Sequence, residues 1–245
     1  MISEAHLPEY VTRLDGRETF AFACHSGVRC FTDCCRMLEL ALTPYDVLRL
    51  RKATGLTSRE LLEHYIITEQ DPGEPFPRFY LTMVDDGRAS CVFVSPEGCT
   101  VYPHRPSACR AYPLGRAAVR AGNGAILEHF VIMKEAHCRG FLEATQQTPL
   151  QYSIDQELTV YNTFNDAVVQ ILQHDAIRQG LIPARKDIEL FTLALYDLDT
   201  FRQMLMEDKV ESTILSQPEK DRLQEDEELL LFAIELLKRQ LFGIF

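Results

Sequence analysis

Four cysteines within twelve residues constrain this chain more than any other feature. The stretch CHSGVRCFTDCC, residues 24–35, ends in the adjacent pair Cys34 and Cys35. Adjacent side chains point to opposite sides of a strand and diverge on a helix, so these four thiols fit one tetrahedral ion poorly. Thiolate is nevertheless the ligand that zinc and iron–sulfur clusters select. Further ligands are therefore expected from elsewhere in the chain.

Four more cysteines, all before residue 139, can supply those ligands. Only Cys30 and Cys34 have the short spacing of a zinc knuckle, and the ferredoxin spacings are not matched. Such sites usually need four protein ligands, so the set could fill two centres, and the adjacent pair favours a polynuclear or two-centre site. Disulfides or ordinary buried thiols are the alternatives. The candidate metal ligands are Cys24, Cys30, Cys34, Cys35, Cys91, Cys99, Cys109 and Cys138.

The acidic balance of the chain limits its partners. The 245 residues carry a formal net charge of -11 at pH 7, whereas sequence-independent binding to nucleic acid or to an anionic membrane needs a basic surface. The first residues do not resemble a secretory signal, and no apolar stretch reaches the ~20 residues that span a bilayer. We therefore expect a soluble, cytoplasmic protein with no nucleic-acid or membrane partner, whose reduced thiols serve metal binding.

Capping and turn signals divide the first part of the chain into short elements. Thr43, Pro44 and Gly55 mark the ends of one helix, and Thr57 with Glu60 has the capping-box spacing of a second. Residues 71–133 then read as short strands joined by glycine turns, among them FYLTMV, SCVFV, CTVY and the hairpin GRAAVRAGNGAILEHFVIM. Because short strands bury little apolar surface, a bound metal would hold this part together.

The last hundred residues have no cysteine and a helical pattern. After a polar connector at 143–151, three helices are predicted: one from Ser153 with Gln156 as capping partner, one over 187–206, and one after Ser216. Asp197 and Asp199 fall on different faces of the second helix and read as surface charge. The expected fold class is α+β. A cysteine-rich, metal-stabilised region of short helices and short antiparallel strands spans 1–145, and a helical bundle at 146–245 packs on it.

Basic residues near the later cysteines offer further contacts. Residues 98–127 contain no acidic residue but four arginines, whose guanidinium groups could offset the charge of a thiolate-bound metal and donate to sulfur: Arg105, Arg110, Arg116 and Arg120. A basic surface loop is the alternative. Arg105 and Arg110 are the candidate cofactor-binding residues. Three histidines could complete a mixed site, but a supporting or solvent-facing role fits them better: His25, His104 and His137.

The cysteine segments resemble a known family. CHSGVRCFTDCC with LTPYDVLRL after it, CVFVSPEGCTVYPHRPSACRAYP at 91–113, and the late Cys138 are similar to the CxxCxxCC family, the zinc- or iron-chelating domain of YkgJ-like cysteine cluster proteins. The spacing in the family name is not kept, since five residues separate Cys24 from Cys30. The resemblance covers about residues 20–140 and implies chelation of zinc or iron. Flagellin lysine N-methylase looks like an enzymatic relative, for which an iron–sulfur cluster is implied.

Three functions are therefore carried forward. The leading hypothesis is a cysteine cluster protein that binds zinc or iron, the latter also as an iron–sulfur cluster. The second is an iron–sulfur enzyme related to the protein lysine methylase, although the sequence shows no G-x-G-x-x-G loop and singles out no catalytic residue. The third is a scaffold with a structural zinc whose C-terminal bundle binds a protein partner.

Overall fold

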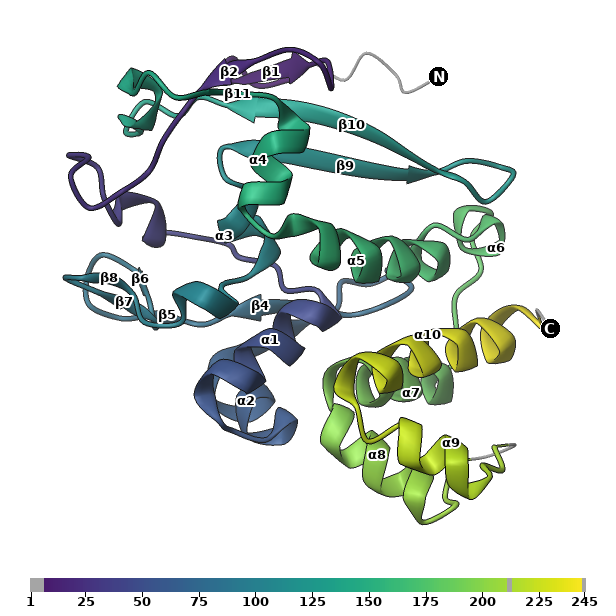
Figure 1. Ribbon diagram of the computed structural model, residues 1–245. Helices are drawn as coiled ribbons and strands as arrows, with labels where there is room; N and C mark the ends of the chain where they lie inside the picture. Colours follow the sequence, from purple (N-terminus) through teal and green to yellow (C-terminus); the bar gives the residue numbers. More distant parts are fainter. Residues whose placement is uncertain (1–6, 211–212, 244–245) are drawn as a thin grey trace.

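The computed structural model describes residues 7–210 and 213–243 (Figure 1). This part of the chain contains ten α-helices and eleven short strands, and every strand pairing is antiparallel. The predicted α+β class is confirmed. No helix in the described ranges is both long and apolar enough to cross a bilayer.

A three-stranded sheet lies in the upper part of Figure 1. Its strands run in the order β1 (Val11–Leu14), β10 (Ile126–Met133) and β9 (Leu114–Arg120). The β9–β10 hairpin is the predicted one, and Gly124 takes a φ of 83° in its turn, a conformation that favours glycine. Strand β1 was not anticipated, because four residues without a flanking partner give no hairpin signal. Close by, β2 (Phe20–Ala21) pairs with β11 (Gln146–Gln147).

Short hairpins carry two of the cysteines. They pair β3 (Ile66–Glu69) with β4 (Arg78–Leu81), β5 (Met83–Val84) with β6 (Ser90–Cys91), and β7 (Val94–Ser95) with β8 (Gly98–Cys99). The strand expected over CTVY is wrong beyond Cys99. A turn leads there into a 3-10 segment at Tyr102–His104, because Pro103 has no amide hydrogen to give to a sheet.

The first two helices confirm the predictions made from their ends. In α1 (Pro44–Thr54) the Thr43 hydroxyl accepts from the Asp46 amide, the Asp46 carboxylate accepts from the Thr43 amide, and Gly55 ends the helix with a φ of 70°. In α2 (Ser58–Tyr65) Thr57 and Glu60 form the same reciprocal pair. Local side-chain capping was enough to predict where both helices begin.

The helix predicted from Ser153 begins earlier and is divided. After the short α3 (Ser107–Ala111), Thr148 and Gln151 form the capping box of α4 (Pro149–Asp155), so Ser153 lies inside a helix. The supposed connector at 143–151 is therefore ordered, since it includes β11 and this cap. The longer α5 (Leu158–Leu172) follows, and it buries the predicted face: Leu158, Tyr161, Phe164, Val168 and Ile171.

The two remaining predicted helices are also divided. The first becomes α7 (Arg185–Tyr196) and α8 (Leu198–Met206), and the second becomes α9 (Gln217–Arg222) and α10 (Asp226–Phe242); a short α6 (Asp175–Arg178) precedes them. Asp197 is not surface charge. The break between α7 and α8 leaves it 3% exposed, with its carboxylate 2.6 Å from Arg59. Apolar spacing continues across the break, so periodicity alone did not reveal it.

Two apolar cores hold the elements together. The larger joins buried faces of α1, α2, β4, α5, α7, α8 and α10. The smaller includes Leu114 and Ile132 of the three-stranded sheet together with Phe20, Phe22 and Tyr152. Both cores use residues from either side of residue 145. The C-terminal helices are thus packed on the cysteine-bearing region.

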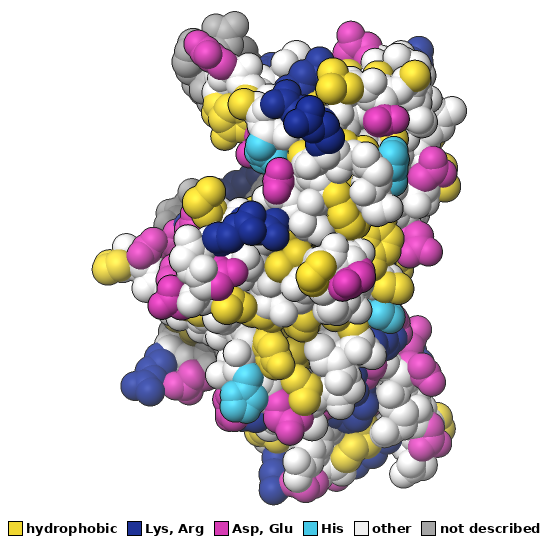
Figure 2. All heavy atoms as spheres, turned by 90° about the vertical axis from the view of Figure 1, so that its left-hand side faces the viewer, with side chains coloured by type: hydrophobic (Ala, Val, Ile, Leu, Met, Phe, Trp, Pro, Cys, Tyr) yellow, Lys and Arg dark blue, Asp and Glu magenta, His cyan; other side chains and the backbone are white. Residues whose placement is uncertain are grey.

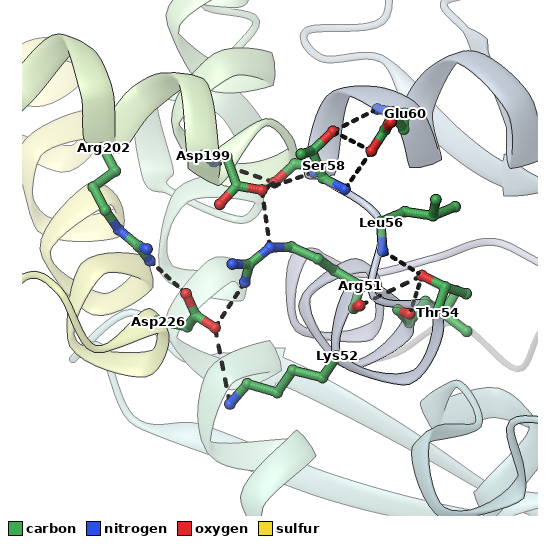
Figure 3. Close-up of polar contacts among 11 residues, drawn as sticks. Arg51, Lys52, Thr54, Leu56, Ser58, Glu60, Asp199, Arg202 and Asp226 are labelled. Atoms are coloured by element: carbon green, nitrogen blue, oxygen red, sulfur yellow. Dashed lines mark hydrogen bonds and ion pairs between the residues drawn. The ribbon is translucent and has the colours of Figure 1, made fainter.

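An ion-pair network joins α1 to the C-terminal helices (Figure 3). Arg51 donates to Asp199 at 2.9 Å and to Asp226 at 2.7 Å. Asp226 also pairs with Arg202 of α8, and Asp199 accepts from the amide of Ser58 at 2.8 Å. These contacts fix the start of α2 and the end of α1 against α8 and α10.

Candidate metal centre

Six of the eight cysteines line one cavity of about 1040 Å³. The segments that bear them lie on the left of Figure 1, and Figure 2 looks onto that side, where basic and acidic side chains are interspersed. All eight cysteines are free thiols, so the disulfide alternative finds no support. The cysteines at the cavity wall are Cys24, Cys34, Cys35, Cys91, Cys99 and Cys109.

Cys30 and Cys138 join the opening run to the late segment. The amide of Arg139 donates to the Cys30 sulfur at 3.0 Å, and the amide of Ala23 donates to the carbonyl of Gly140 at 3.1 Å. A Cβ at Gly140 would lie 2.5 Å from the Phe22 ring and 2.7 Å from the Ala23 carbonyl oxygen, so only glycine allows this approach. Cys138 packs against the smaller core. Cys24, Cys30 and Cys138 therefore form one group, which we call the upper thiols.

Cys91, Cys99 and Cys109 form a second group, the lower thiols, which pack against the larger core. Cys91 and Cys99 lie in β6 and β8, and Cys109 lies in α3. Helix α3 is held by the buried Asp46, whose carboxylate accepts from the amide of Ser107 at 2.7 Å and from its hydroxyl at 3.0 Å. The residue that caps α1 thus also anchors the element that carries Cys109.

Cys34 lies between the two groups on a 3-10 turn, Asp33–Cys35. Burial raises the pKa of each lower thiol, and Cys34 raises it further. Cys24 is partly exposed, but neighbouring protein atoms still remove water from its sulfur. This desolvation, and after it the nearby thiols of Cys34, Cys30 and Cys138, raise the pKa of Cys24 to about 11. The pKa of Cys34 itself is raised, first by its contact with the Cys35 thiol and then by burial. Negative charge on these sulfurs is mutually unfavourable unless a cation lies among them.

Arg105 lies beside both groups. Its side chain is 9% exposed, and its guanidinium lies 3.8 Å from the centre of the Tyr102 ring while it donates to the Tyr102 carbonyl at 2.9 Å. Its positive charge acts against burial by lowering the pKa of Cys24 and Cys99. The expectation that this guanidinium offsets the charge of a thiolate-bound metal stays a prediction.

The other arginines make different contacts. Arg110 is 2% exposed and donates to the carbonyls of Arg105 and Gln156 at 3.2 Å and 2.8 Å, so it braces the backbone. Arg116 pairs with Asp166 and Glu128, and Arg120 pairs with Asp175. The expectation that Arg116 and Arg120 face the thiols is wrong. Both lie on β9, where they pair with acidic residues that come after residue 127 in the sequence. The basic surface loop is also wrong for Arg105 and Arg110, which are buried.

The three histidines have partners other than the thiols. His104 accepts from Arg49 at 3.2 Å through Nδ1. His25 lies 3.7 Å from Glu143, and His137 lies 3.9 Å from Glu135. These contacts suit the supporting or solvent-facing role expected for them.

Tyr112, at the end of α3, is a site residue that sequence reasoning missed. It lines the cavity, and its phenol oxygen is buried without a hydrogen-bond partner among the described residues. Burial raises the pKa of Tyr112, and Cys138 and Glu135 raise it further, so the phenol keeps its hydrogen. The signal that could have found it is its place in the string CRAYP, between Cys109 and Pro113.

The thiols surround a cavity and do not converge on a point. Within 7–210 and 213–243, no three His, Cys, Asp or Glu side chains stand close enough to bind one metal ion. In a tetrahedral zinc site the sulfurs lie about 3.8 Å apart, because each zinc–sulfur bond is about 2.3 Å. The donor set still fits a thiolate-bound metal: the ligands are soft and free, and a cation would relieve their mutual repulsion.

A comparison with known families agrees with this chemistry. Residues 23–139 match the CxxCxxCC family, described as "Putative zinc- or iron-chelating domain". No curated protein and no solved structure matches the chain significantly. The match begins one residue before Cys24 and ends one residue after Cys138, so it includes all eight cysteines. This supports metal binding and confirms the resemblance: the model of the CxxCxxCC family covers the cysteine-bearing part of the chain, residues 23–139.

Proposed function

We propose that the chain binds zinc or iron through two groups of cysteine thiolates at one cavity. The observation that carries the proposal is that cysteines of both groups, with Cys34 and Cys35, line one cavity. The electrostatic effect of Cys34 on thiols of both groups supports it. Cys35 then extends the same turn beside it. The ligands are Cys24, Cys30 and Cys138 on one side, Cys91, Cys99 and Cys109 on the other, and Cys34 with Cys35 between them.

The spread of the thiols favours a centre with more than one metal atom. Four sulfurs around a single ion must lie close together, whereas a cluster or a pair of ions can take ligands from opposite walls of a cavity. An iron–sulfur cluster is thus the preferred cofactor and structural zinc the competing one. A bound metal would supply electron-transfer or Lewis-acid chemistry, and its binding energy would add to the stability of the short hairpins. Eight free thiols also suit a reducing compartment, so we propose a cytoplasmic location.

Arg105 and Arg110 have different parts in this proposal. Arg105 offsets thiolate charge, because its guanidinium acts on thiols of both groups. Arg110 holds the backbone around Arg105 through the carbonyl contacts described above. Arg105 is accordingly the stronger candidate for contact with a bound cofactor.

One purification tests the metal and its form. The full chain is prepared without oxygen, zinc, iron and acid-labile sulfide are counted per chain, and the visible spectrum is recorded. Brown protein with matching iron and sulfide is expected. Colourless protein with stoichiometric zinc would contradict the iron–sulfur cluster and support structural zinc. Protein that holds neither metal and keeps its fold in chelator would end the metal proposal.

The size of the cavity favours an iron–sulfur enzyme as a second candidate function. Small-molecule sites typically have volumes of about 300–1,000 Å³, and this cavity reaches about 1040 Å³. Its wall includes polar side chains beyond the thiols, among them Tyr102, Arg105 and His137. Native mass spectrometry of the anaerobically purified chain would reveal a retained small molecule as mass beyond protein plus metal. A mass explained by protein and metal alone would leave the binding role without an enzymatic one.

A further inference from the structure

Tyr112 is fixed in place at the boundary between the smaller core and the cavity. Its amide donates to the Ala108 carbonyl at 3.1 Å, which ends α3. Its carbonyl accepts from the Tyr152 hydroxyl, and its ring meets the Phe22 ring edge-on with centroids 6.4 Å apart. Backbone and ring are thus held on three sides, so the phenol oxygen cannot turn elsewhere without loss of packing.

The phenol of Tyr112 stands out because it has no partner. Buried hydroxyls are usually hydrogen-bonded, and one that is not needs an explanation. Tyr152, a neighbour in the same core, shows the ordinary case, since its hydroxyl bonds to backbone carbonyls. Among the described residues, Arg36 is the other cavity-lining side chain with a buried unpaired atom, but its guanidinium also donates to Thr32. The Tyr112 hydroxyl forms no hydrogen bond of normal geometry with a described residue, although Cys138 and Glu135 lie near enough to act on it.

The neighbours of the Tyr112 phenol point to its acceptor. After burial, Cys138 and Glu135 are the groups with the largest effect on the pKa of Tyr112. The amide of Cys138 donates to the carbonyl of Glu135 at 3.0 Å, so the two residues belong to one backbone turn. Cys138 packs on the same core as Tyr112. A neutral thiol is a weak acceptor, whereas a metal-bound thiolate is a strong one.

We propose that Tyr112 donates its phenol hydrogen to the sulfur of Cys138 when that sulfur is bound to metal, and that it is a positioning residue of the metal centre. The inference rests on the proposed metal-binding function. Donors to ligand sulfur hold the thiolate in its bound orientation and stabilise its charge. Tyr112 therefore stabilises the metal-loaded state through this hydrogen bond. In the metal-free state its buried hydroxyl has no hydrogen-bond acceptor among the described residues.

The substitution Tyr112→Phe separates these two states because it keeps the ring and removes one oxygen. In metal-free protein the unfolding midpoint stays unchanged or rises, since a buried unpaired hydroxyl is gone. In loaded protein the rate of metal loss to excess EDTA under nitrogen, followed by elemental analysis, rises about 10-fold or more. Tyr152→Phe is the matched control: it breaks bonds present in both states, so it lowers the midpoint of both.

The outcomes distinguish this inference from the function beneath it. A Tyr112→Phe protein that loses metal at the wild-type rate overturns the role of Tyr112 while the metal site stands. Glu135→Gln tests the other acceptor. If it speeds metal loss as much as Tyr112→Phe does, and the double variant loses metal no faster than either single variant, the phenol donates to the Glu135 carboxylate and not to Cys138. Wild-type protein that retains no metal overturns the proposed function itself.

Discussion

The main-chain amide of Arg139 donates to the sulfur of Cys30 at 3.0 Å, between residues 109 positions apart. Together with the bond from Ala23 to Gly140, it holds Cys138 beside the opening cysteine run. A backbone amide that donates to a cysteine sulfur fixes the position of that side chain. The upper thiols are thus brought together by the protein itself, through hydrogen bonds as well as through packing.

Loss of one thiol from each group tests whether the two groups are separate centres. Because the proposed polynuclear centre takes ligands from both groups, we expect Cys138→Ser and Cys109→Ser each to remove most of the bound metal. The double variant should retain almost none. Elemental analysis of the anaerobically purified variants measures this. If each single variant loses only about half of its metal, the two groups form separate centres and the shared centre is contradicted.

The stability of metal-free protein should depend on thiol ionisation. Burial raises the pKa of Cys109 above the ordinary thiol value of 9.0, so the folded state keeps the proton at a pH where the unfolded chain loses it. The contribution of Cys109 to the unfolding free energy is fully present below pH 9. It is lost as the pH rises above 9, by at most about 1.4 kcal/mol per pH unit. Urea unfolding between pH 8 and 11 measures the slope.

The variant Cys109→Ala identifies the source of that slope. It removes one protected thiol, so the decrease in unfolding free energy above pH 9 should become shallower than in the wild type. Metal-loaded protein should show little decrease, because a bound metal already holds the thiolates. An unchanged slope in the variant would contradict the assignment to Cys109.

Helix ends were predictable where neighbouring residues decide them. Thr43 and Asp46 cap α1 through each other, and Gly55 ends it, so the sequence contains the whole signal. The break at Asp197 was not predictable in this way. The apolar residues Leu195 and Leu198 keep a helical spacing across it, and the partner of Asp197 is Arg59 in α2, far away in the sequence.

The cysteines of the candidate site could be listed from the sequence, but their arrangement in space could not. The thiols and the resemblance followed from residue types and spacing. The pairing of the late segment with the opening run depends on the close approach at Gly140, and the role of Tyr112 depends on its burial without a partner. Neither leaves a periodic or spacing signal, because both arise from contacts between residues distant in the sequence.

The ion-pair network should matter more for stability than isolated surface pairs. The Asp226 side chain is 13% exposed and contacts Arg51 and Arg202, so Asp226→Ala removes the carboxylate partner of Arg202 and one of the two carboxylate partners of Arg51. We expect a loss of about 2 kcal/mol in unfolding free energy. The pair of Arg185 and Glu189 is largely exposed, and Glu189→Ala should cost less than about 0.5 kcal/mol. Equal costs in urea unfolding would contradict a structural role for the network.

Asp46 links helix capping to the lower thiols, and its loss should affect both stability and metal retention. The buried carboxylate accepts from the Thr43 amide at 2.9 Å and from the Ser107 amide at 2.7 Å, so Asp46→Ala leaves donors unsatisfied at the starts of α1 and α3. We expect the unfolding free energy, measured with urea, to fall by about 3 kcal/mol. Metal release to EDTA should also become faster, because α3 carries Cys109.

Glu60 provides the matched control for Asp46. It has the same position in the capping box of α2, but it is exposed and lies outside the residues that line the cavity. Glu60→Ala should lower the unfolding free energy clearly less than Asp46→Ala does and leave metal release unchanged. If both variants release metal at the wild-type rate, α3 does not depend on Asp46 for its position. If both accelerate release equally, general destabilisation, and not the bond to Ser107, accounts for the effect.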